Sequence, residues 1–192
     1  MKQTLLIITA LMLMLGCEDT QTEGSDGIDA GVVINEINYN SSDGFDPEDW
    51  VEIYNKSSDA LDISSWLIKD ENDDHIFTIP SNTLLLPDQY LVFCTDTLKF
   101  KTLFPDVNQY FGNLGFGLGG GSDFVKLFDS SEWLVDAVEY DDTAPWPTES
   151  DGNGPTLELI NPSLDNALGV NWAASDGYGT PGAVNSVYVA DE

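Results

Sequence analysis

The sequence predicts an all-β fold, a sandwich or a barrel, on three observations. Short apolar runs that alternate with a period of two residues recur along the chain, clusters of turn-forming residues separate them, and no sustained helical period is present. The predicted strands are 31–39, 50–55, 63–69, 75–80, 84–86, 89–95, 124–128, 133–140 and 156–160. Only 97–104 is expected to form a short helix, which Pro105 ends.

The strand at 50–55 illustrates the alternation. Val51 and Ile53 fall on one face of it, and Trp50, Glu52 and Tyr54 fall on the other. A chain of 192 residues, of which 42% are hydrophobic and 11% aromatic, can bury one good core. It is too short to favour two ordinary domains.

The charge of the chain is unusual. Six lysines and no arginine stand against 34 acidic residues, which gives a formal net charge of −28. Such a surface repels phosphate backbones and anionic lipid headgroups, so we expect no nucleic-acid partner. It attracts divalent cations and basic proteins instead.

The N-terminus predicts an exported lipoprotein. Lys2 precedes an apolar run from Leu5 to Leu15, which is too short to span a bilayer and is typical of a signal peptide over residues 1–16. Gly16 and Cys17 follow, as in the lipobox of bacterial lipoproteins. This resemblance implies cleavage between these two residues and a lipid on Cys17 that holds the protein to a membrane.

Residues 17–31 are acidic and rich in Ser, Thr and Gly, which predicts a flexible tether. Glu18 and Asp19 resemble the acidic signal that sends some lipoproteins to the cell surface. With Cys17 lipidated, Cys94 is left without a partner for an intrachain disulfide.

Four segments carry a family resemblance: INEI at 34–37, WVEIYN at 50–55, GNGPTLELINPSLDN at 152–166 and GTPGAVN at 179–185. In order and spacing they resemble the lamin tail domain in its bacterial, exported form. The resemblance implies an immunoglobulin-like β-sandwich over 32–186, followed by a tail at 187–192, and a role in attachment rather than catalysis. Asp88 and Gln89 depart from it, since a glycine is expected before the tyrosine strand.

One acidic loop is a candidate metal site. Asp43, Asp46, Glu48 and Asp49 crowd together before Trp50, and Ca²⁺ accepts six to eight such oxygens. The alternative is a mobile acidic loop without metal. The run 70–74 imitates the start of an EF-hand, but His75 stands where that loop requires glycine, so a solvated turn is expected there.

Catalytic patterns are weak. The spacing G-x-G-x-x-G at 115–120 is followed by a predicted strand rather than a helix, so we expect a loop crossing between sheets and no nucleotide site. His75 is the only histidine, and no nucleophile elbow accompanies it. Cys94 shares a strand face with Tyr90 and Val92 and is expected to be buried. We therefore assign no catalytic residue.

The five tryptophans are expected mostly in the core, because large aromatics dominate sandwich interiors. Trp146 lies between two prolines and is the one we expect to be an exposed binding aromatic.

The sequence thus predicts a non-catalytic, lipid-anchored binding or attachment module of the bacterial envelope. We expect an outer-membrane lipoprotein that reaches the cell surface and binds an envelope polymer or protein, with no cofactor other than calcium. One alternative is a surface or matrix component that assembles through exposed edge strands. The other is a metal-dependent hydrolase built on the acidic loops.

Overall fold

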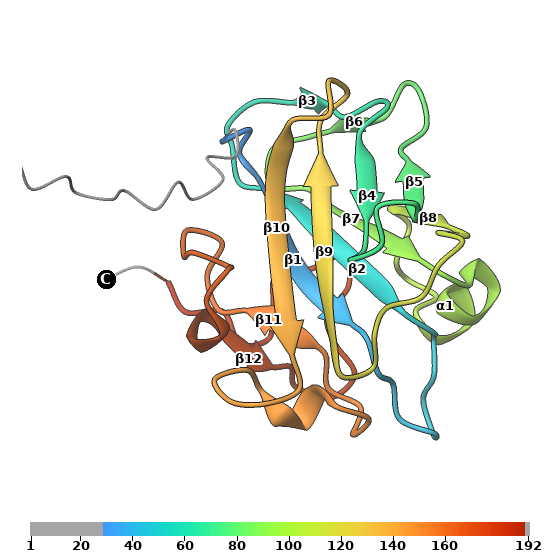
Figure 1. Ribbon diagram of the computed structural model, residues 1–192, viewed down its shortest axis with the longest axis vertical. Coiled ribbons are helices and arrows are strands. Elements are labelled where there is room, and N and C mark those ends of the chain that lie inside the picture. The colour runs from blue at the N-terminus through green and yellow to red at the C-terminus, as the bar shows by residue number, and fades with distance from the viewer. Residues whose placement is uncertain (1–28, 191–192) are drawn as a thin grey trace, which may run out of the picture.

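The computed structural model describes residues 29–190, which form a β-sandwich with one short α-helix (Figure 1). A six-stranded sheet has the order β12-β11-β1-β2-β7-β8, and a four-stranded sheet has the order β10-β9-β4-β5. The six are β12 (Trp172–Ala174), β11 (Leu157–Leu159), β1 (Val32–Asn38), β2 (Trp50–Asn55), β7 (Tyr90–Cys94) and β8 (Tyr110–Gly112). The four are β10 (Leu134–Asp141), β9 (Ser122–Phe128), β4 (Leu67–Lys69) and β5 (Ile76–Thr78).

The smaller elements complete the chain. Strands β3 (Leu61–Asp62) and β6 (Leu84–Leu85) form a two-stranded pair. The α-helix is α1 (Thr97–Leu103), and two short 3₁₀ turns are η1 (Thr148–Ser150) and η2 (Gly169–Asn171). Among residues 29–190, no helix has the length and apolar character needed to cross a membrane.

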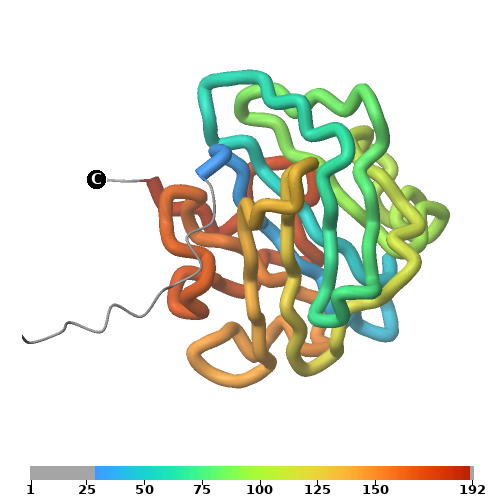
Figure 2. The backbone as a smooth tube through the Cα atoms, turned by 45° about the horizontal axis from the view of Figure 1, so that its top comes forward, coloured from blue at the N-terminus to red at the C-terminus, as the bar shows by residue number. Residues whose placement is uncertain are grey.

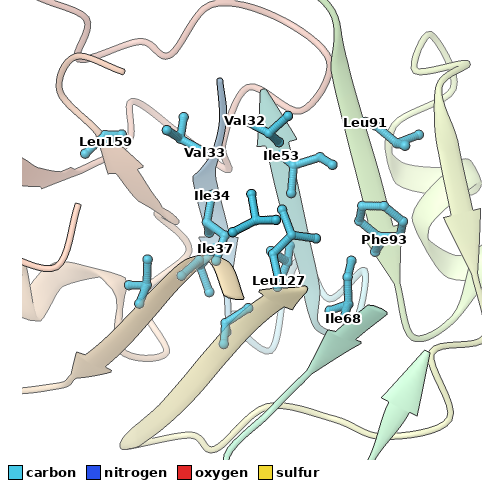
Figure 3. Packing of buried hydrophobic residues seen from close by; sticks show 14 of the residues in the cluster. Val32, Val33, Ile34, Ile37, Ile53, Ile68, Leu91, Phe93, Leu127 and Leu159 are labelled. Carbon is cyan, nitrogen blue, oxygen red and sulfur yellow. The ribbon is translucent and has the colours of Figure 1, made fainter. Parts of the chain in front are cut away.

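The main core lies between the two sheets. Figure 3 shows Ile53 and Phe93 of the six-stranded sheet facing Ile68 and Leu127 of the four-stranded sheet, and all four are at most 2% exposed. The tube in Figure 2 shows the same two layers from a tilted direction. Period-two alternation places these apolar side chains on the inner face of each sheet.

The other face of the six-stranded sheet, which we call the outer face, is also covered. Along β2, the outer-face residues Trp50, Glu52 and Tyr54 meet three different surroundings. Trp50 packs under α1, with its ring 6.0 Å from that of Phe100. Glu52 lies under the C-terminal chain, and Tyr54 lines a pocket. Both faces of β2 are therefore buried over most of its length.

Helix α1 is fixed by local chemistry. The side chain of Asp96 caps its N-terminus and accepts hydrogen bonds from the backbone N–H groups of Leu98 and Lys99, both at 2.9 Å. The helix ends before Pro105, as the sequence predicts. Its buried Phe100 forms a second apolar cluster with Trp50, Val92 and Cys94 on the outer face.

Every strand expected from the sequence overlaps an observed strand, and the immunoglobulin-like, all-β prediction is confirmed. Three further strands, β3, β8 and β12, are only two or three residues long and were not predicted. The glycine-rich loop at 115–120 does cross from one sheet to the other, since β8 lies in the six-stranded sheet and β9 in the four-stranded sheet. The acidic run 70–74 is the turn between β4 and β5.

Candidate functional site

Three buried glutamates stand in a row on the outer face. Glu36 of β1 pairs in register with Glu158 of β11 on one side and with Glu52 of β2 on the other. Each is 0% exposed. Carboxylates are rarely so deeply buried unless other groups compensate them, so the row must be held by specific partners.

The partners come from the C-terminal strap, which we define as residues 179–189. The backbone N–H of Thr180 donates to Glu36 at 3.0 Å, and its hydroxyl donates to Glu158 at 2.7 Å. The N–H of Gly182 donates to Glu52 at 2.5 Å. Ser186 then donates from its hydroxyl to Glu158 at 2.7 Å. The three carboxyl groups thus fasten the strap across the sheet.

Burial changes the acidity of two members of this row, Glu36 and Glu52. It raises the pKa of Glu36 well above 4.5, and the neighbouring charges of Glu52 and Glu158 raise it further. Burial likewise raises the pKa of Glu52 to about 8, against hydrogen bonds from Gly182 and Asn35 that lower it. Glu36 Oε2 is buried without a hydrogen-bond acceptor or donor partner within residues 29–190. Burial thus favours the protonated forms of Glu36 and Glu52 in the folded protein.

Asn35 and Asn185 join the strap to the sheet. The pairing of β1 with β2 shifts between Ile34 and Glu36, and this bulge turns Asn35 to the outer face. Its amide donates to Glu52 at 3.1 Å and to Asn185 Oδ1 at 2.7 Å. The amide of Asn185 donates in return to the carbonyls of Asn35 at 3.0 Å and Leu159 at 2.8 Å.

A pocket of about 310 Å³, which we call the tyrosine pocket, opens beside the strap. Tyr54 and Tyr90, on neighbouring strands, stack with ring centroids 4.6 Å apart. The pocket is lined by Asn35, Tyr54, Lys56, Tyr90, Leu159, Asn161, Pro162, Ser163, Val184, Asn185 and Tyr188. Its floor is made of buried asparagines, and its rim includes exposed Lys56 and Tyr188. The strap forms one wall.

The strap continues past the boundary predicted for the sandwich at residue 186. The N–H of Val187 donates to Glu158 at 3.1 Å, and that of Val189 donates to the carbonyl of Ile160 at 3.0 Å. The carbonyl of Val189 accepts from the Asn161 amide at 2.9 Å. The described part of the predicted tail, 187–190, therefore docks on the sandwich.

The candidate calcium loop is organised around a lysine. Asp43, Asp46, Glu48 and Asp49 all line one pocket of about 340 Å³. However, Lys99 Nζ lies 3.0 Å from Asp46 Oδ2 and also contacts the Glu48 carboxylate. Asp49 accepts a hydrogen bond from the N–H of Leu118 at 2.7 Å, and burial raises its pKa to about 6.

Within the described chain, no group of three or more histidine, cysteine or acidic side chains is placed to hold a metal ion. The four carboxylates of the loop thus line one pocket but do not point to one common position. Lys99 pairs with two of them, and a backbone N–H donates to a third. Calcium binding there stays a prediction.

The expectation for Trp146 was wrong. Its side chain is only 8% exposed, and its ring lies 5.9 Å from that of Trp172. Gly169 allows this packing, because a Cβ there would lie 3.0 Å from the Trp146 ring. The exposed tryptophan is Trp133, at 66%, beside the turn between β9 and β10.

The lone histidine and the described cysteine have structural partners. His75 Nδ1 lies 2.6 Å from Asp70 Oδ2, and its ring stacks on Phe116 at 5.4 Å. Cys94 is buried, and burial raises the pKa of its thiol to about 11, which keeps it protonated at neutral pH. Gly16, Cys17 and the part of the tether before Asp29 lie outside the described residues.

The glutamate row and the tyrosine pocket were not predicted from the sequence. One signal was present in the sequence, because Glu36 and Glu52 each stand inside a strand of mostly apolar residues. In the structure, both faces of these two strands are buried around the glutamates. The pocket joins β1, β2, β7, the end of β11 and the strap, and no local pattern connects these five segments.

Comparison with known proteins gives one family. A family model described as Lamin Tail Domain matches residues 29–142. A solved structure of a DUF4876 family protein from Bacteroides thetaiotaomicron is similar over 60% of this chain, with 12% sequence identity and a TM-score of 0.42. The matched region covers 55% of the solved chain, so the present chain spans about half of the length of that protein. No curated protein matches the sequence.

Proposed function

The chain belongs to the lamin tail domain family, and from this premise we propose that it is a binding or attachment module of the bacterial cell envelope. In this proposal a lipid on Cys17 holds it to the outer membrane, residues 18–31 give it reach, and the sandwich binds an envelope polymer or protein. Domains of this family are immunoglobulin-like and generally non-catalytic.

The observation that carries the proposal is the tyrosine pocket on the outer face. It is open to solvent at Lys56 and Tyr188, while its floor is fixed by the hydrogen bonds of Asn35 and Asn185. Preformed, concave surfaces that mix aromatic and polar groups are typical of ligand sites. The buried glutamates lie beneath the strap and serve to fasten it.

Anchoring is tested by metabolic labelling with an alkyne analogue of palmitate. The wild-type chain should incorporate the label, and Cys17→Ala should not. Cys94→Ala is the matched control, because Cys94 is the other cysteine of the chain and is buried. Equal labelling of wild type and Cys17→Ala would contradict the anchor.

Binding is tested by capture of envelope components on the full chain, held in detergent and immobilised. The proposal expects a saturable envelope component that free protein displaces. Capture that is the same on a column of heat-unfolded chain would contradict a binding role for the folded sandwich.

Assembly through edge strands is a second candidate, favoured by the length of β10. This strand has eight residues and lies at the edge of the four-stranded sheet. Against it, β10 carries a bulge near Asp136, and the Asp136 carboxylate accepts from the N–H of Ile34 at 2.6 Å. Bulges and acidic side chains protect edges. A mass that rises with concentration in sedimentation equilibrium would favour assembly.

A calcium-dependent role is the third candidate, and it rests on Asp43, Asp46, Glu48 and Asp49. If calcium displaces Lys99 from this loop, millimolar calcium should raise the melting temperature of the chelated protein, and Asp46→Asn should remove the rise. An unchanged melting temperature would end both the calcium site and a hydrolase that depends on it.

A further inference from the structure

The tyrosine pocket is distinguished by its charge. The chain contains 34 acidic residues among 192, yet none of the eleven residues that line this pocket is Asp or Glu. Three other pockets on the described surface each contain at least two acidic residues. The tyrosine pocket contains Lys56, which also borders the neighbouring pocket that holds Asp29, Asp136 and Asp165. The lining of the tyrosine pocket therefore runs against the composition of the whole molecule.

The pocket is also rich in hydrogen-bond donors that have no partner. Within residues 29–190, the Lys56 ammonium makes no hydrogen bond or ion pair, and its charge acts only through space on Asp136. The hydroxyl groups of Tyr90, Tyr188 and Ser163 likewise make no hydrogen bond in this part of the chain. The amide of Asn35, in contrast, is already used by Glu52 and Asn185.

Flat apolar surfaces stand beside these donors. Tyr54 and Tyr90 form a stacked pair with an interplanar angle of 27°, and Tyr54 is held by a 2.9 Å hydrogen bond from its hydroxyl to Asp88. Val184 and Tyr188 of the strap are 58% and 46% exposed. Tyrosine presents a large apolar face with a polar tip, which suits a ligand that has one flat apolar side and polar groups around its edge.

We propose that this pocket binds the carboxylate-bearing sugar unit of an acidic glycan, with the carboxylate at Lys56 and the sugar ring against the tyrosines. A single lysine matches a single negative charge. The hydroxyl donors of Tyr90, Tyr188 and Ser163 suit the acceptor oxygens of such a sugar. The volume of about 310 Å³ lies at the lower end of the range of small-ligand sites, which fits one sugar unit.

The net charge of −28 does not prevent this interaction. The screening length is about 8 Å at physiological ionic strength, so charges on the far side of the sandwich act weakly on a ligand seated here. Two carboxyl groups beside the lining bond to lining residues. Glu52 accepts from the Asn35 amide, and burial raises its pKa to about 8, so it is largely uncharged at neutral pH. Asp88 accepts from the Tyr54 hydroxyl at 2.9 Å and is not among the lining residues. The inference deepens the proposed binding function, and rests on it, by naming the class of ligand.

The test is ligand-observed saturation-transfer NMR on the full chain in detergent. The probes are D-glucuronate, N-acetylmuramate, D-glucose and acetate. We expect saturable signals from one or both acidic sugars, and only weak signals from glucose, which lacks the carboxylate, and from acetate, which lacks the ring. Which acid binds better separates a uronate polymer from a glycan whose muramyl units carry a free carboxylate, with no peptide attached, as the source.

Three variants locate the site. Lys56→Gln should weaken binding of the acidic sugar about tenfold, the loss expected for one charge-assisted hydrogen bond. Tyr90→Phe keeps the aromatic ring and should weaken binding of the acidic sugar about threefold, the loss expected for one neutral hydrogen bond. Lys69→Gln is the matched control and should change nothing, because Lys69 Nζ lies over Phe128 on the other sheet. Unchanged melting temperatures would show that each variant folds.

Any of three results would overturn the inference: glucose binds as well as glucuronate, acetate gives the same signal, or Lys56→Gln binds normally. The outcome is separable from that of the proposed function. Envelope capture without binding of either acid would reject the acidic sugar and leave attachment standing. Binding of an acidic sugar without envelope capture would reject the proposed attachment and leave the sugar site standing.

Discussion

At the scale of single residues, Gly179 decides whether the strap can reach the glutamates. Its φ is +93°, and a Cβ added there would lie 2.4 Å from Glu36 Oε1 and 2.9 Å from the Thr156 methyl group. A side chain would thus meet both a forbidden conformation and the buried carboxyl group. This close approach explains why the motif at 179–185 begins with glycine.

Gly179→Ala should therefore lower the free energy of unfolding by about 2–4 kcal/mol, the sum of a positive-φ penalty and a steric clash in a closed site. The measurement is urea unfolding followed by tryptophan fluorescence. Gly177→Ala is the matched control, because its φ is +72° but nothing lies within 4 Å of its added Cβ. It should cost about 1–2 kcal/mol, the conformational part alone. Equal losses would mean that contact with Glu36 is unimportant.

The tryptophans give a second test at this scale. Trp146→Ala should cost about 3–5 kcal/mol, since it removes a buried ring packed against Trp172. Trp133→Ala should change stability by less than about 0.5 kcal/mol, because that side chain is 66% exposed. Thermal unfolding of the two variants compares them directly. A larger loss for Trp133→Ala than for Trp146→Ala would contradict the observed burial.

At the scale of elements, the strap behaves as a piece of the sandwich without being a strand. Its hydrogen bonds run to side chains of β1, β2 and β11 and to carbonyl groups of β1 and β11, and Asn185 donates to both of these carbonyls. Asn185 is 5% exposed. Its amide bonds with two carbonyls, and its Oδ1 accepts from Asn35.

Asn185→Ala should cost about 2–4 kcal/mol, because it leaves buried donors and acceptors of Asn35 and Leu159 unpaired. Amide hydrogen exchange should rise first in the strap, at Val187 and Val189, whose N–H groups are bonded to Glu158 and Ile160. Asn153→Ala is the control, since its amide makes an exposed bond to the carbonyl of Asp151. If exchange rose equally throughout the sheets, the strap would not be a separate unit.

The elements also show how far the sequence alone could lead. Strands such as β2 and β9 were predicted because alternation is a local property of five to eight residues. The parallel strand β8 and the last strand β12 have three residues each and exist only through their neighbours β7 and β11. Trp146 was misjudged for the same reason, since its burial depends on Gly169 and Trp172, more than twenty residues away.

The candidate sites divide in the same way. The acidic loop at 43–49 could be recognised from the local sequence. The local sequence could not show that Lys99, about fifty residues later, would form ion pairs with Asp46 and Glu48. The strap motif was recognised by resemblance, whereas its use of three glutamates depends on the register of β1 with β2 and β11. Register is set by the whole sheet, so no segment read by itself could reveal the row.

At the scale of the whole molecule, the glutamate row ties stability to pH. Burial raises the folded-state pKa of Glu52 from 4.5 to about 8 and raises that of Glu36 above 4.5, while the unfolded chain keeps ordinary values. Between these limits the folded protein binds more protons than the unfolded one, so stability falls as pH rises. Asp49, raised from 3.8 to about 6, adds to the fall at lower pH.

The melting temperature should accordingly be higher near pH 5 than near pH 8, by about 2–4 °C for each kcal/mol of stability lost in a domain of this size. Four acids have a pKa that is lowered from 3.8: Asp46, Asp62, Asp73 and Asp141. The stability that they contribute is lost as pH falls below this ordinary value, so they do not oppose the trend between pH 5 and pH 8. Glu52→Gln should flatten the fall, because a neutral amide replaces a group that must otherwise hold a proton.

Glu149→Gln separates this effect from general repulsion, since it removes one charge from an exposed position and should leave the slope unchanged. Scanning calorimetry of wild type and both variants between pH 5 and pH 8 is the measurement. A melting temperature that is flat or rises with pH would show that Glu36 and Glu52 are charged in the folded state. In that case an ion or a solvent-filled space would have to lie under the strap, where the structure places three carboxyl groups and their hydrogen-bond donors.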